Sequence, residues 1–78
     1  MKTISIFQVQ DINNLLKQNN YDYVLKLNDT CGNQNLYLQC TGKTTDINEL
    51  CNLINNYLKN NYLQVIPSTI NPYNLTLK

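Results

Sequence analysis

Two runs of alternating apolar residues, at 21–28 and 35–41, constrain this chain more than any other feature. Each run has an apolar side chain at every second position, which is typical of strands that bury one face. One antiparallel register aligns three apolar pairs, Leu27 with Leu36, Leu25 with Leu38 and Tyr23 with Cys40. A slip of one residue would lose every pair. The sequence therefore predicts a hairpin in this register.

The same register defines a second face of the hairpin. On it, Lys26 pairs with Tyr37 and Val24 pairs with Gln39. An open sheet face with an aromatic and an aliphatic side chain can dock a partner protein or another copy of the chain. Scattered exposed apolar residues are also normal on protein surfaces, so ordinary surface is the alternative. These four residues are a candidate interaction surface.

The segment between the two runs combines an acid, a hydroxyl, a thiol, a glycine and two amides. These candidate binding residues are Asp29, Thr30, Cys31, Gly32, Asn33 and Gln34. The alternative is turn chemistry, because Asp and Asn bond their own backbone and Gly permits positive φ. A functional thiol at Cys31 needs a lowered pKa, from a cation, a histidine or a helix N-terminus. None of these is adjacent in the sequence.

The first helix has two possible starts. Ser5 can cap it, with Gln8 completing a capping box and Ile4 packing against Val9. Alternatively, residues 3–9 form a strand and Asp11 caps a shorter helix. The first reading accounts for more of the apolar positions. In either case Asn19-Asn20 ends the helix, since asparagine tolerates the left-handed conformation.

A second helix is predicted from Asp46 as N-cap with Glu49 three residues on, and it closes at residues 59–61. Short strands at residues 62–66 and 73–77 follow, with two prolines in the turn between them.

The element order predicts one α+β domain over residues 1–78. It is a two-layer sandwich with two helices on one face of an antiparallel sheet, written (β)αββαβ(β). A strand at residues 2–4 would make it ferredoxin-like, and without that strand the order is αββαββ. The chain shows no fixed-period repeat, only a weak two-fold echo of helix followed by hairpin.

Composition limits the classes of function. The chain has no histidine, which excludes Ser–His and Cys–His catalytic units and disfavours a zinc site. Six lysines are scattered and arginine is absent, which argues against nucleic-acid binding. No apolar run reaches the roughly 20 residues of a membrane span, and from the residues at the N-terminus we expect no signal peptide. We therefore expect a cytoplasmic protein that needs no cofactor and no metal.

The three cysteines are expected to stay reduced. Cys31 and Cys40 lie at opposite ends of one predicted strand, near 25 Å apart, whereas a disulfide needs a Cα separation below about 7 Å. Cys40 and Cys51 are expected to point into the core as small apolar residues.

Asparagine supplies 15 of the 78 residues. Together with abundant lysine, isoleucine and tyrosine, and with no arginine, this bias is typical of AT-rich codons.

The segment Asn28-Asp29-Thr30-Cys31-Gly32 resembles the motif of a group of small uncharacterised bacterial proteins. That group, common in Gram-positive anaerobes, carries Arg-Asp-Ala-Cys (RDAC) followed by glycines. Asp29, Cys31 and Gly32 match the motif in register, while Asn28 replaces its arginine and Thr30 its alanine. The resemblance implies a small bacterial protein and supplies no activity. It also implies that a cation beside the thiol is missing here.

These features favour a non-enzymatic binding or interaction module, acting through the 29–34 segment or through the open sheet face. The partner is an unknown protein or a second copy of the chain. The alternative is a thiol-dependent role for Cys31, in redox chemistry or soft-metal binding, and the sequence leans against an enzyme.

Overall fold

The computed structural model describes residues 3–30 and 33–78. Its elements, in chain order, are α1 (Ile6–Gln18), β1 (Tyr23–Thr30), β2 (Asn33–Cys40), α2 (Ile47–Leu58) with the 3-10 turn η1 (Lys59–Asn61), β3 (Val65–Pro67) and β4 (Asn74–Leu77). Within the described residues, four strands form one antiparallel sheet in the order β1-β2-β4-β3.

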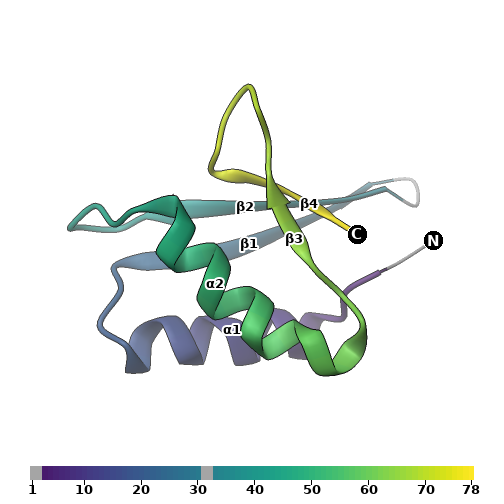
Figure 1. Ribbon diagram of the computed structural model, residues 1–78, viewed down its shortest axis with the longest axis horizontal. Helices are drawn as coiled ribbons and strands as arrows, with labels where there is room; N and C mark the ends of the chain where they lie inside the picture. Colours follow the sequence, from purple (N-terminus) through teal and green to yellow (C-terminus); the bar gives the residue numbers. More distant parts are fainter. Residues whose placement is uncertain (1–2, 31–32) are drawn as a thin grey trace.

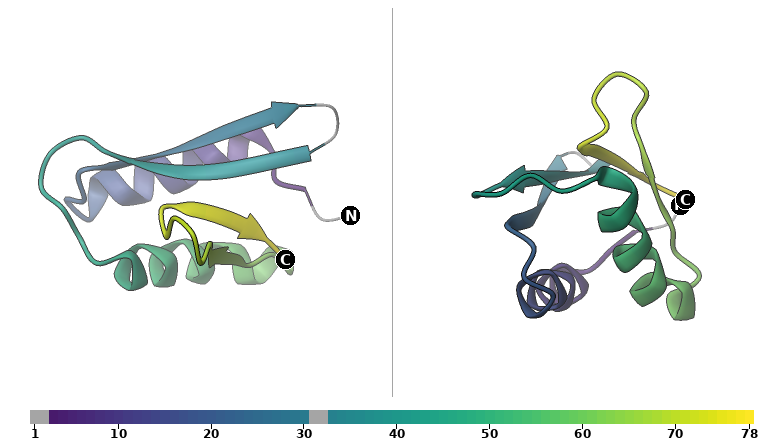
Figure 2. Two further views of the ribbon diagram at one scale, coloured as in Figure 1. Left: turned by 90° about the horizontal axis from the view of Figure 1, so that it is seen from above. Right: turned by 60° about the vertical axis from the view of Figure 1, so that its left-hand side comes forward.

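Both helices lie on one face of this sheet, as Figures 1 and 2 show. The predicted α+β sandwich of two layers is therefore confirmed. Residues 3–5 form no strand, so the described elements follow αββαββ rather than the ferredoxin-like alternative.

The first helix starts where the capping box predicts. The Ser5 Oγ accepts a hydrogen bond from the Gln8 N–H at 3.2 Å, and the Gln8 Oε1 accepts one from the Ser5 N–H at 2.8 Å. The alternative start at Asp11 is wrong. At the other end Asn20 has a left-handed φ of 62°, as expected for an asparagine that terminates a helix.

The second helix is capped by Asp46, whose side chain accepts a hydrogen bond from the Asn48 N–H at 3.1 Å. Glu49 was expected only to complete this cap. Instead, its carboxylate accepts a hydrogen bond from the Tyr21 hydroxyl at 3.4 Å and so links the helix to the residues before β1.

The register of the first hairpin is confirmed for all five predicted pairs, from Tyr23–Cys40 to Leu27–Leu36. β1 lies two residues closer to the hairpin tip than predicted, and β2 begins two residues and ends one residue earlier than predicted. Tyr21 lies before β1, and its N–H donates to the Leu16 carbonyl of α1 at 3.0 Å. The Asp22 carboxylate accepts from the Lys43 N–H at 2.9 Å.

The second hairpin is shorter than predicted. Tyr62 was expected to open its first strand, but it ends the preceding turn with a left-handed φ of 57°. Val65 pairs with Leu77, and the two hairpins join where Leu36 of β2 pairs with Leu75 of β4.

One apolar core lies between the sheet and the helices, and its fully buried members are Ile12, Leu16, Leu25, Leu36, Leu50, Ile54, Leu58 and Val65. Cys51 belongs to this core, and burial raises the pKa of its thiol. The prediction that Cys40 is also buried is wrong. Cys40 is the last residue of β2, and its Sγ donates to the Gly42 carbonyl at 3.2 Å in an exposed turn.

Two six-residue segments of the chain are similar, and we call them the two copies. The segment Ile12–Lys17 reads INNLLK and the segment Ile54–Lys59 reads INNYLK. The bonds that end the two helices also correspond, because Tyr21 N–H donates to Leu16 O at 3.0 Å and Leu63 N–H donates to Leu58 O at 3.3 Å. Each half is thus a helix followed by a hairpin, and in the sheet order β1-β2-β4-β3 each hairpin supplies one central and one edge strand.

One asparagine in each copy binds an edge strand. The Asn13 amide accepts from the Leu25 N–H at 2.7 Å and donates to the Leu25 carbonyl at 3.1 Å. The Asn55 amide binds Val65 in the same way, at 2.7 and 3.2 Å. Leu25 and Val65 lie on the two edge strands of the sheet. At Leu25 and Val65 these side chains take the place of a neighbouring strand and occupy the N–H and the carbonyl that a further strand would use.

We predict that Asn13→Ala lowers the free energy of unfolding by about 1–3 kcal/mol, because the Leu25 N–H and carbonyl lose both partners. Asn55→Ala should act similarly through Val65. Urea denaturation measures both changes. The matched controls are Asn14→Ala and Asn56→Ala, exposed neighbours on the same helices, which should change stability by less than about 0.5 kcal/mol. Equal losses in variants and controls would contradict this role.

Candidate functional site

The sheet face opposite the helices is uncovered by the described residues, and the loop between β3 and β4 rises from that side (Figure 1). All four predicted interaction residues lie on it, with Lys26 opposite Tyr37 and Val24 opposite Gln39. Tyr37 is 40 % exposed and pairs with Asn74 of the adjacent strand β4. We call this surface the Tyr37 face, formed by Val24, Lys26, Asn28, Asn35, Tyr37, Gln39, Asn74 and Thr76.

Part of the Tyr37 face is a hollow of about 420 Å³. Its side chains are amides, hydroxyls and one aromatic ring, from Asn28, Asn35, Tyr37, Ser68, Asn74 and Thr76. Asn28 and Asn35 face each other across β1 and β2. The hollow therefore presents hydrogen-bonding groups around a tyrosine, with Lys26 beside that ring as the nearby cation.

The asparagines of this hollow differ from four asparagines elsewhere in the fold. Asn13, Asn19, Asn55 and Asn71 each bind backbone groups through their side chains. Within residues 3–30 and 33–78, the side chains of Asn28, Asn35 and Asn74 make no hydrogen bond to the protein. Asparagine is depleted in strands. These three residues therefore contribute neither strand propensity nor a side-chain hydrogen bond to the sheet that carries them.

The predicted binding segment at the hairpin tip is placed only in part. Asp29 and Thr30 end β1 and Asn33 begins β2, while Cys31 and Gly32 lie outside the described residues. Gln34 has a structural use: its amide accepts from the Ile4 N–H at 2.8 Å and donates to the Ile4 carbonyl at 3.0 Å. The thiol role of Cys31 and the RDAC resemblance stay predictions.

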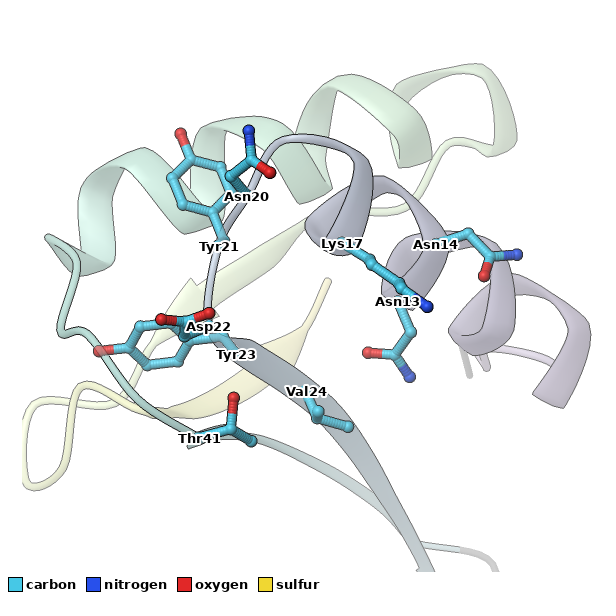
Figure 3. Close-up of a pocket in the computed structure, with 9 residues that line it drawn as sticks. All are labelled: Asn13, Asn14, Lys17, Asn20, Tyr21, Asp22, Tyr23, Val24 and Thr41. Atoms are coloured by element: carbon cyan, nitrogen blue, oxygen red, sulfur yellow. The ribbon is translucent and has the colours of Figure 1, made fainter.

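A second hollow, of about 530 Å³, lies between α1 and the start of β1 (Figure 3). Asn13, Asn14 and Lys17 line one side of it. The Asn13 amide is already committed to Leu25, and the Asp22 carboxylate to the Lys43 N–H. In Figure 3 the Tyr23 ring projects to the opposite side of the strand from these α1 side chains. The lining groups do not converge, so this hollow is the weaker candidate.

A third hollow, of about 380 Å³, opens beside Cys40. The rings of Tyr23 and Tyr73 stack in its wall with centroids 5.9 Å apart. The Tyr23 hydroxyl accepts from the Thr45 N–H at 3.2 Å, and this bond lowers the pKa of Tyr23. Burial, Tyr73 and Cys40 act in the opposite direction and raise the pKa of Tyr23 to about 12.

The described residues contain no group of three His, Cys, Asp or Glu side chains that could hold a metal ion. Among the same residues, every buried side-chain nitrogen and oxygen has a hydrogen-bond partner. In that part of the chain no helix has both the length and the apolar character needed to cross a membrane.

No protein-family model matches the chain, and neither a curated protein nor a solved structure is significantly similar to it.

Sequence reasoning found Tyr37 and its neighbours on the first hairpin but missed the amides around it. Asn28 and Asn35 occupy outward positions of predicted strands, where asparagine is unfavourable. The alternation of the two runs was enough to reveal that conflict. The contribution of Asn74 could not be predicted in this way, because it requires β4 to pair with β2.

Tyr23 predicts a loss of stability at high pH. The unfolded chain releases this phenolic proton near pH 10.0, whereas the folded protein holds it to about pH 12. Between these values the folded state binds more protons, so stability falls as the pH rises, by up to about 1.4 kcal/mol per pH unit.

Urea denaturation of wild type and Tyr23→Phe across this pH interval measures the effect, and the variant should have a shallower slope. Tyr37→Phe, which removes an exposed phenol, is the control. Identical slopes for wild type and Tyr23→Phe would contradict the assignment.

Proposed function

We propose that this protein is a non-enzymatic protein-binding module and that the Tyr37 face is its binding surface. The observation that carries the proposal is a half-exposed tyrosine surrounded by three asparagines whose side chains make no hydrogen bond within the described residues.

The composition of the face supports a polypeptide partner. Tyrosine offers a large, rigid contact area at low conformational cost, while Ser and Asn offer adaptable hydrogen bonds. This is the combination found in protein-binding loops of antibodies. Tyr37 supplies the ring, and Asn28, Asn35, Ser68 and Asn74 supply the amides and the hydroxyl.

The arrangement of the face also supports this role. β2 and β4 are the central strands of the sheet, so Tyr37 and Asn74 lie near the middle of the surface. Energetically dominant residues of interfaces are enriched in tyrosine and cluster near the centre of the contact. We therefore assign the anchor role to Tyr37 and the orienting role to the asparagines.

Site-specific photocrosslinking in cells tests the proposal. A photoreactive residue at position 37 or 35 should capture one recurrent protein. The same residue at Asn52, an exposed position on α2, should not. Failure to capture any protein at positions 37 and 35, or equal capture at position 52, would reject the Tyr37 face.

With the captured partner in hand, we expect Tyr37→Ala to weaken binding at least about tenfold, as for a central aromatic anchor. Asn74→Ala should weaken it less, and Asn52→Ala should not change it. Calorimetric titration measures the affinities, and circular dichroism verifies that each variant is folded. A partner that binds wild type and Tyr37→Ala equally well would contradict the anchor role.

A further inference from the structure

The loop at residues 68–73 displays an apolar side chain to solvent. Ile70 is 95 % exposed. Its loop is held in shape by its own bonds: the Ile70 N–H donates to the Ser68 Oγ at 3.2 Å, and the Tyr73 N–H donates to the Asn71 Oδ1 at 3.1 Å. The Ser68 N–H also donates to the Asn74 carbonyl at 2.8 Å. A side chain presented by an ordered loop loses little freedom when it binds.

A hollow able to receive such a side chain lies on the same part of the surface. This is the hollow beside Cys40, of about 380 Å³, lined by Tyr23, Leu38, Gln39, Cys40, Thr44, Asn71 and Tyr73. Two stacked tyrosine rings, a leucine and a thiol make most of its wall apolar.

The position of the hollow favours a second copy of the chain as its occupant. Asn71 and Tyr73 line the hollow and belong to the loop that carries Ile70. A two-fold contact uses the same patch on both copies, so the inserted side chain and the receiving hollow must lie together on one surface.

The charge of this patch agrees with that occupant. Neither loop 68–73 nor any residue that lines the hollow is charged. Two copies can therefore approach across a two-fold axis without bringing like charges together, which would otherwise oppose the contact.

We propose that two copies of this chain associate about a two-fold axis, each inserting Ile70 into the hollow of the other copy formed by Tyr23, Leu38, Cys40 and Tyr73. The contact is small, so the dimer is weak and depends on concentration. It uses a surface other than the centre of the Tyr37 face and does not rest on the protein-binding role proposed there.

Sedimentation velocity over a wide concentration range tests the proposal. Wild type should shift from monomer to dimer, and Ile70→Ser should weaken the dimer about a hundredfold, because each of two symmetric contacts loses about a factor of ten. The matched control is Thr69→Ala, an exposed neighbour in the same loop, which should dimerise as wild type does.

The thiol of Cys40 gives an independent readout in a Cys31→Ser background, in which Cys51 is buried. Its rate of reaction with iodoacetamide should fall as the protein concentration rises, and Ile70→Ser should abolish that dependence. A wild-type chain that remains monomeric throughout overturns the proposal. A dimer that survives Ile70→Ser also overturns the proposal. If that dimer is lost on Tyr37→Ala, self-association takes place on the Tyr37 face instead.

Discussion

The arrangement of this fold depends on amide side chains that bind backbone groups as a neighbouring strand would. Asn13 holds Leu25, Asn55 holds Val65, and Gln34 holds Ile4. Each pair uses both an N–H and a carbonyl, which fixes the orientation as well as the distance. The two asparagines join each helix to an edge strand, while Gln34 ties the segment before α1 to β2. Both helices pack their apolar side chains on one face of the sheet, and the opposite face is left open.

The same residue type therefore has two uses in the molecule. Asn13 and Asn55 on the helices bind the backbone, and asparagines on the open face present their amides to solvent. A codon bias alone would place both kinds without regard to position, yet Asn28, Asn35 and Asn74 come together in one hollow from three strands. Their cost in strand propensity is acceptable because Leu25, Leu36 and Leu75 on the other face supply the burial that holds the sheet together.

Local chemistry was predictable from the sequence. The Ser5–Gln8 capping box and the pairing of Tyr23 with Cys40 follow from side-chain identity and alternation alone. The failures concern where the chain ends one element and begins another. Cys40 occupies a position of β2 whose side chain points to the same side as the core residues. It is the last residue of the strand, however, and the alternation of apolar residues does not predict whether other side chains bury that end. At the candidate site, Tyr37 was predictable because its strand partner is close in sequence, whereas Asn74 depends on a pairing between distant strands.

The duplicated helix–hairpin unit has a consequence for how unfolding and binding are connected. Within each half, the contacts join residues close in sequence, so each half closes only short loops as it forms. The long-range step is the docking of β2 on β4 through the pairs Leu36–Leu75 and Tyr37–Asn74. The Tyr37 face crosses this seam. A ligand that binds both Tyr37 and Asn74 would favour the docked halves over the separated ones, so the free energy of unfolding would rise with the ligand concentration.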